Sequence, residues 1–171
     1  MVMAALCGCQ THTNLLARTP ADEEMFGPVS MRLHPTFTEI KDWTGDNKPD
    51  GIEAVVELDD QFGDPTRATG KVVFELYGYR FAAPDPKGMR LAGPWLGSLL
   101  TKDDQVAHWS SAIRGYSFQL VDPTVSKGRS YVLTAEFDLG SRGRLFDQVV
   151  IEGTGIDRRA VHASPQDPSL Y

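Results

Sequence analysis

The chain has 171 residues, of which 41% are hydrophobic and 23% charged, and its formal net charge is −6. This length suits one domain with tails, and the apolar content is high enough for a packed core, which argues against global disorder. The acidic balance disfavours a nucleic-acid partner, because an acidic surface repels phosphates. No apolar run reaches the roughly 18 residues that a bilayer-spanning helix needs. Beyond Cys7 and Cys9 the body has no cysteines, which excludes a disulfide framework and a cysteine-ligated zinc site there.

Both cysteines follow a short apolar stretch at the N-terminus. The run Leu6-Cys7-Gly8-Cys9 resembles the lipobox of bacterial lipoproteins, in which a leucine and a small residue precede the lipid-modified cysteine. The resemblance implies that residues 1–8 are a remnant signal peptide and that Cys9 carries the lipid. It also implies a membrane-anchored lipoprotein of the bacterial cell envelope. Gln10, in place of an acidic residue, implies outward sorting, to a periplasm-facing or outer-membrane position.

The signal itself is incomplete in this sequence. A secretory signal needs a basic segment and an apolar core of about 7–15 residues, whereas only Met1 to Leu6 precede the motif and none of them is basic. We therefore interpret residues 1–8 as a truncated signal with its true start upstream. Two alternatives stay open: a cytoplasmic chain with a redox-active or metal-binding Cys-x-Cys pair, and cysteines with no role.

Residues 9–28 are mostly polar and turn-forming, and predict a tether between the anchor and the folded body. Residues 157–171 have a similar composition and predict a flexible tail. The folded domain is therefore expected to span residues 29–156.

Alternating apolar and polar residues dominate this body and predict strands with one face in water. The clearest cover 52–59, 72–77, 116–120 and 131–139, and weaker candidates cover 29–38, 89–96 and 146–152. Gly93-Pro94 marks the segment 89–96 as an edge strand or a bulge, and Val149-Val150-Ile151 is apolar on both faces, which is typical of a central strand. Together they predict an all-β fold, a single antiparallel β-sandwich of about seven strands.

The connections carry recognisable turn chemistry. Asp60 to Pro65 and Gly140 to Gly143 predict tight turns between successive strands. Residues 101–109 predict one short helix with Thr101 as its N-cap. Residues 82–112 read as a long connection, with loops at 82–88 and 93–97, and long loops of this kind are often functional.

The segment Ile52 to Phe74 consists of an alternating strand, an Asp-x-x-Gly-x-Pro turn and a second alternating strand. It is similar to a unit of bacterial immunoglobulin-like, transthyretin-like and macroglobulin-like domains. The resemblance implies an immunoglobulin-like or transthyretin-like sandwich, and it implies a fold without a function.

The most acidic stretch, residues 39–64, has nine acids against two lysines. Within it, Asp42, Asp46 and Asp50 with Asn47 and Gly51 resemble a calcium loop, since hard carboxylate oxygens on a glycine-containing turn suit Ca²⁺. The spacing departs from the standard loop and the bidentate glutamate is missing. The alternative is a solvated turn in which these side chains bind backbone amides.

The remaining candidates for chemistry are few. His108 beside Ser110 and Ser111 is a weak hydrolase candidate, because sequence neighbours rarely form a nucleophile–base pair. Trp95 and Trp109, with Tyr116, are candidates for binding a ligand on flat aromatic faces. The alternative places both tryptophans in the core beneath the long connection.

We therefore expect a non-catalytic interaction or structural module that binds another envelope protein. The alternative function is a carbohydrate-binding module that uses the loop tryptophans, and the third is an unrecognised hydrolase. Exposed coplanar rings would favour the glycan, whereas buried rings beside an uncovered edge strand would favour a protein partner bound by strand addition.

Overall fold

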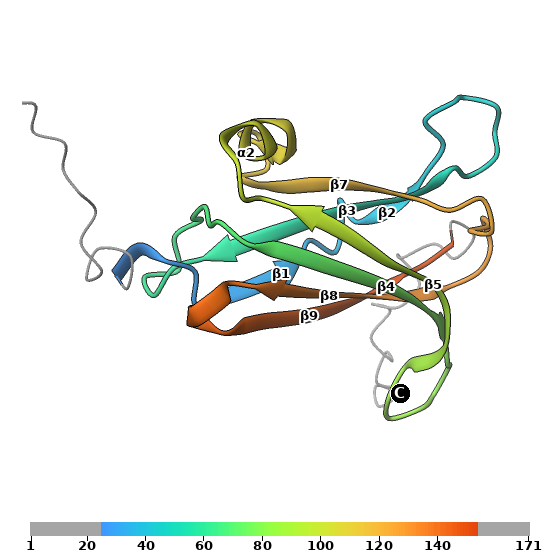
Figure 1. Ribbon diagram of the computed structural model, residues 1–171. Coiled ribbons are helices and arrows are strands. Elements are labelled where there is room, and N and C mark those ends of the chain that lie inside the picture. The colour runs from blue at the N-terminus through green and yellow to red at the C-terminus, as the bar shows by residue number, and fades with distance from the viewer. Residues whose placement is uncertain (1–24, 154–171) are drawn as a thin grey trace, which may run out of the picture.

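The computed structural model describes residues 25–153, which form a β-sandwich of two antiparallel sheets (Figure 1). This confirms the predicted all-β sandwich. The lipobox with Cys9, most of the expected tether and the C-terminal tail lie outside the described residues. Within residues 25–153 no helix is long and apolar enough to cross a membrane.

The first sheet has the order β1-β3-β7-β6, and the short strand β2 pairs with the same side of β3 as β1. Its strands are β1 (Ser30–Leu33), β2 (Glu39–Lys41), β3 (Gly51–Asp59), β6 (Trp109–Ser110) and β7 (Gly115–Val121). The expected strand at 29–38 is interrupted after Leu33, because the His34 ring accepts hydrogen bonds from the amides of Thr36 and Phe37 and turns the chain.

The second sheet has the order β5-β4-β8-β9. Its strands are β4 (Lys71–Tyr79), β5 (Lys87–Ser98), β8 (Tyr131–Asp138) and β9 (Arg144–Ile151). A short helix, α2 (Lys102–His108), connects β5 of this sheet to β6 of the other, and Figure 1 shows it beside β7 at one end of the sandwich.

Two strand predictions change in the structure. Segment 93–97 is part of β5, which is the longest strand described and lies at a sheet edge. The prediction of an edge strand or a bulge at 89–96 is confirmed. The prediction of a loop at 93–97 was wrong, because register shifts in the pairing with β4 break the alternation that identifies a strand. The segment containing Val149 and Val150 is also an edge strand and not a central one. It pairs with β8 alone among the described strands, and its apolar outer face stays partly exposed.

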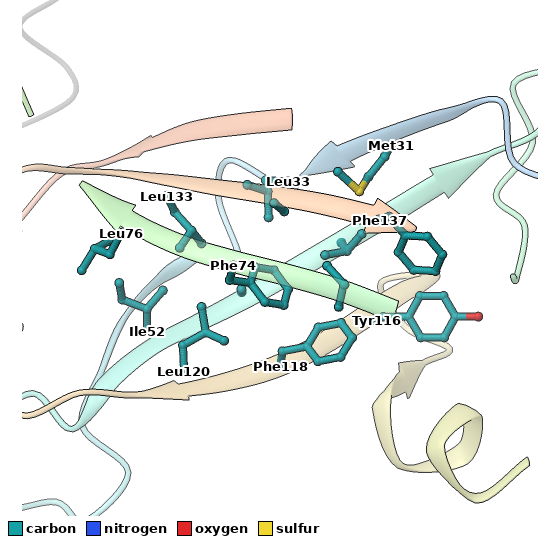
Figure 2. Packing of buried hydrophobic residues seen from close by; sticks show 14 of the residues in the cluster. Met31, Leu33, Ile52, Phe74, Leu76, Tyr116, Phe118, Leu120, Leu133 and Phe137 are labelled. Atoms are coloured by element: carbon teal, nitrogen blue, oxygen red, sulfur yellow. The ribbon is translucent and has the colours of Figure 1, made fainter. Parts of the chain in front are cut away.

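The core fills the space between the two sheets (Figure 2). Alternate residues of β3, β4, β7 and β8 point inward, so the period-two pattern of the sequence becomes one continuous apolar layer. Its largest fully buried side chains include Tyr116, Tyr131, Phe74, Phe137 and Ile52.

The predicted turns form for the reasons that the sequence suggested. The Asp60 carboxylate accepts hydrogen bonds from the amides of Phe62 and Asp64, and Gly63 has a φ of 81° that suits glycine. At the other turn, the amide of Gly143 donates to the carbonyl of Gly140. Both connections are therefore fixed by local chemistry, although only the second is a hairpin, because β3 and β4 lie in different sheets.

One side of the sandwich is closed by a contact between its sheets. There β1 and β9, the edge strands of the two sheets, lie next to each other. The Asp147 carboxylate of β9 accepts a hydrogen bond of 2.7 Å from the backbone amide of Leu33 in β1. A charged side chain on an edge strand that satisfies a free amide discourages pairing with another chain at this side.

Candidate functional site

The opposite side of the sandwich leaves part of strand β7 without a strand partner. Asp122 donates its amide to the carbonyl of Asp50, so the even-numbered residues of β7 direct their backbone groups toward β3. The odd-numbered residues Ser117, Gln119 and Val121 therefore direct theirs outward. Among the described residues, the neighbouring strand β6 pairs only with the first two residues of β7. The outer edge of β7 from Ser117 onward is open.

Two aromatic side chains reach this open edge. The indole Nε1–H of Trp95 donates to the carbonyl oxygen of Val121 at 3.2 Å. Nδ1 of His108 lies 2.8 Å from the carbonyl oxygen of Ser117. Because a carbonyl can only accept, Nδ1 must carry the proton. The two side chains satisfy the carbonyls at either end of the edge, and no side chain among residues 25–153 caps the backbone of Gln119 between them.

A groove of about 440 Å³ lies between β5, β7 and α2. Phe74 and Phe118 form its apolar floor with ring centroids 5.2 Å apart, and the imidazole of His108 stacks on Phe118 at 4.4 Å. Ser98 and Asp104 add polar side chains, and the other lining residues are Pro94, Trp95, Leu96, Gly97, Gln119 and Leu120. An aromatic floor with a few polar groups at the rim is typical of a binding site for an apolar side chain or a small ligand.

Gly97 lets the two sheets approach at the floor of this groove. A Cβ atom at this position would lie 2.5 Å from Cε1 of Phe118 and 2.7 Å from Cγ1 of Val72. Both distances are shorter than ordinary van der Waals contact. The absent side chain is therefore what allows the Phe118 ring to pack against β5.

Helix α2 forms the end wall of the groove and is fixed by its N-cap. The Thr101 hydroxyl accepts from the amide of Asp104, and the Asp104 carboxylate accepts from the amide of Thr101, which is a complete capping box. The same carboxylate accepts from the hydroxyl of Ser98 in β5. Hydrogen bonds from Thr101 and Ser98 hold the pKa of Asp104 below its ordinary value, so it is charged at neutral pH.

Gln105 ties the helix to both sheets. Its amide nitrogen donates to the carbonyls of Ala68 and Leu99 at 2.8 Å each, and its amide oxygen accepts from the hydroxyl of Tyr116 at 2.6 Å. The amide of Ala68 donates in turn to that hydroxyl. Burial raises the pKa of Tyr116, so its hydroxyl keeps its proton and remains a donor.

The predicted aromatic ligand site is only partly assembled. Trp95 lines the groove, but Trp109 lies apart from it, edge-on to Tyr116 at 5.0 Å with Arg67 over its ring at 4.3 Å. Tyr116 is fully buried, and Figure 2 shows its ring within the cluster of core residues. The expectation that Tyr116 offers a flat face to a ligand is therefore wrong, because its inward position in β7 places the ring between the sheets. Both tryptophans are half-buried and pack on the core.

The three predicted calcium ligands do not form one group, although the carboxylates of Asp42 and Asp50 both lie 3.3 Å from the hydroxyl of Thr44. The Asp42 carboxylate accepts hydrogen bonds from the amides of Gly45 and Asn47. The Asp50 carboxylate accepts from the amide of Trp43. The Asp46 carboxylate accepts from the amide of Lys48. Among residues 25–153 no group of three acidic, histidine or cysteine side chains is arranged to hold a metal ion. The residues serve the loop backbone, as the alternative reading expected.

The hydrolase candidate, His108 with Ser110 and Ser111, likewise does not form a nucleophile–base pair among the described residues. Nδ1 of His108 is engaged by the Ser117 carbonyl, and neither Ser110 nor Ser111 is hydrogen-bonded to the ring within the described part of the chain. Gly97, Phe118 and Gln119 line the groove without having been candidates from the sequence. Their spacing gives no signal, because β5 and β7 are brought together by the tertiary fold alone.

Comparisons of the chain with protein-family models, with curated proteins and with solved structures gave no match.

Proposed function

We propose that this chain is a cell-envelope lipoprotein anchored through Cys9, and that its domain is an immunoglobulin-like sandwich acting as a non-catalytic binding module. Strand order supports the immunoglobulin-like type. With β1, β3, β7 and β6 taken as strands A, B, E and D, the first sheet has the order A-B-E-D. With β5, β4, β8 and β9 taken as C′, C, F and G, the second has the order C′-C-F-G, which is the arrangement of that fold.

A tyrosine at the start of β8 supports the same assignment. The hydroxyl of Tyr131 accepts a hydrogen bond of 3.0 Å from the backbone amide of Ser126, in the connection from β7. Immunoglobulin-like domains have such a tyrosine corner between strands E and F. The sequence contained this signal in the spacing of the two residues, but only together with the strand order does it distinguish one kind of sandwich from another.

The binding module is proposed to take an extended segment of another protein along the open edge of β7. The observation that carries this proposal is the uncovered backbone of Gln119, which lies beside an aromatic groove between two edge strands. A peptide strand added there would pair with this backbone and would place every second side chain toward the floor at Phe118. Exposed apolar side chains near the groove, Leu96 and Val121 among them, supply the apolar surface that such a partner covers.

The test removes the backbone donor and keeps the fold. A random-peptide display library is panned against the full chain, and enriched peptides are measured against Gln119→Pro and the matched control Gln119→Ala. Proline is tolerated at this position because the amide of Gln119 points away from β3. We expect the enriched peptides to have alternating apolar residues and to bind the Gln119→Ala variant with the same affinity as the parent. They should lose about tenfold or more in affinity with the proline variant.

A second variant tests the same proposal without changing the backbone, in case the proline itself disturbs the sheet. Leu96→Asp changes an exposed side chain at the rim of the groove and should weaken the same peptides without altering circular dichroism. The strand-addition proposal fails if no peptide is enriched. It also fails if the enriched peptides bind both variants as tightly as the parent.

The anchor is tested separately in cells. A gene with its start extended upstream is expressed with Cys9 intact and as Cys9→Ser, and membrane and soluble fractions are compared. We expect the parent in the membrane fraction and the variant released from it. The membranes are washed with high salt before fractionation, because salt weakens electrostatic binding to headgroups but does not remove an acyl anchor. Equal fractionation of the two proteins after this wash would end the lipoprotein proposal and leave the groove proposal untouched.

A further inference from the structure

The hairpin that joins β4 to β5 carries the two most exposed large apolar side chains among the described residues. Phe81 exposes 87% of its surface and Met89 exposes 79%. Figure 1 shows this hairpin projecting from the end of the sandwich opposite the blue start of the described chain. Neither side chain contributes to the core, so their exposure costs the folded protein free energy that an interacting surface would recover.

Basic residues lie close to these two apolar residues in the sequence and on the neighbouring connection. Arg80 precedes Phe81 and is exposed, and Lys87 lies at the base of the loop with Nζ 5.2 Å from the Tyr77 ring. Arg129 is exposed on the neighbouring connection, which joins this hairpin through the hydrogen bond from Tyr79 to the carbonyl of Ser130.

Among the described residues, the acidic groups nearby offset this charge in part. Glu152 is the neighbour of Gly153, which lies against the backbone of Arg129. Asp85 is the one acid within residues 80–91, and its carboxylate accepts from the amide of Lys87. Glu75 is paired with Arg90 at 2.6 Å, and that pair is neutral as a whole. The acidic β2–β3 loop lies at the same end of the molecule, but Figure 1 places it on the other side of that end. A locally basic hairpin on a chain of net charge −6 is thus set apart from its surroundings.

We propose that this hairpin tip is a membrane-binding element that inserts Phe81 and Met89 into the interface of an anionic lipid bilayer. Exposed apolar side chains flanked by lysine and arginine match the two components of such a surface, the acyl boundary and the anionic headgroups. Arg80 and Lys87 would lie at the headgroups while the two apolar side chains enter the boundary. This contact is independent of the lipid on Cys9 and of the groove.

The experiment uses the full chain carrying Cys9→Ser, so that no attached lipid contributes. Co-sedimentation is measured with vesicles of phosphatidylglycerol and phosphatidylcholine in equal parts, and with vesicles of phosphatidylcholine alone. The variants are Phe81→Ser with Met89→Ser, and Arg80→Glu. Phe62→Ser is the matched control, because Phe62 is also an exposed phenylalanine but lies on the β3–β4 turn.

We expect binding to the mixed vesicles and much weaker binding to phosphatidylcholine alone. The double serine variant should lose about tenfold or more in partition coefficient. Arg80→Glu should lose about fivefold or more, and added salt should weaken binding by the parent. The Phe62→Ser control should bind like the parent.

Three results would overturn the proposal. The first is no binding to the anionic vesicles, and the second is an equal loss for Phe62→Ser and the double serine variant. The third is self-association of the parent in the absence of lipid that the double serine variant abolishes, because the tip would then cover a second copy of the chain. None of these results bears on peptide binding at Gln119, so the two proposals fail independently.

Discussion

The hydrogen bonds of Gln105 allow a quantitative test of how helix α2 is held on the sandwich. The helix has no buried residue of its own, so its attachment depends on polar contacts more than on apolar packing. Gln105 makes three of these contacts, with the hydroxyl of Tyr116 and with the carbonyls of Ala68 and Leu99. Two substitutions divide this network: Gln105→Ala removes all three contacts, and Tyr116→Phe removes the hydroxyl and keeps the ring.

The expected magnitudes follow from the number and burial of these bonds. A typical hydrogen bond contributes about 1 kcal/mol net to the free energy of unfolding, and a buried group left without its partner costs about 1–3 kcal/mol. Tyr116→Phe should therefore destabilise the protein by about 1–2 kcal/mol. Gln105→Ala should cost about 2–3 kcal/mol, because it also leaves the carbonyls of Ala68 and Leu99 without this donor. The bond between the two side chains is lost in either variant, so the double variant should cost about 1 kcal/mol less than the sum.

Urea unfolding of the parent, both single variants and the double variant measures this coupling, with circular dichroism as the readout. Tyr131→Phe provides the matched control, because its hydroxyl is bound to the amide of Ser126, and Tyr131 pairs with Gly78 at the end of β4 away from α2. Tyr131→Phe combined with Gln105→Ala should be additive within about 0.5 kcal/mol. The reasoning is refuted if the Gln105–Tyr116 pair is as additive as this control pair.

Three further outcomes follow from other contacts. Gly97→Ala should destabilise the protein by about 1–3 kcal/mol in the same assay, since the new methyl group overlaps the Phe118 ring. An unchanged denaturation midpoint would contradict the tight approach of the sheets. Asp147→Ala should lower the free energy of unfolding by about 1 kcal/mol, because it leaves the amide of Leu33 without its acceptor. Protection of that amide from hydrogen exchange should also fall, and unaltered exchange would argue against the contact. The pKa of Asp104 is lowered in the folded state, so its stabilising effect is complete above the unfolded value of about 4 and is lost as pH falls through the folded value. Asp104→Asn should therefore lower the thermal midpoint at neutral pH and lower it less in acid, and a difference independent of pH would contradict this sign.

Local patterns in the sequence were sufficient for the strands that have one face in the core. Alternation along β3 and β8 identified both strands because their pairing is regular and one face meets the apolar layer between the sheets. The short helix was found from its N-cap at Thr101, and the turn at Asp60 from side-chain hydrogen bonding to its own backbone. These features depend on residues close together in the chain.

Edge strands were read less well, for a physical reason. Strand β5 pairs on one side only and shifts register against β4, so no continuous period marks it. Strand β9 has apolar residues on both faces, which is usual for a central strand, and yet it lies at an edge where Phe146 remains 57% exposed. Position in a sheet depends on which strands pair, and that is decided by contacts distant in sequence.

The sequence by itself determined the class of this fold, because alternation and turn chemistry act over a few residues and require no partner. Which aromatic residues are exposed was decided only by the tertiary structure. Trp95 lines the groove whereas Trp109 packs edge-on to Tyr116 away from it, and no local pattern distinguishes these two tryptophans. The groove at Gln119 and Gly97 likewise exists because edges of two different sheets meet there, and no pattern along one strand contains the position of the other.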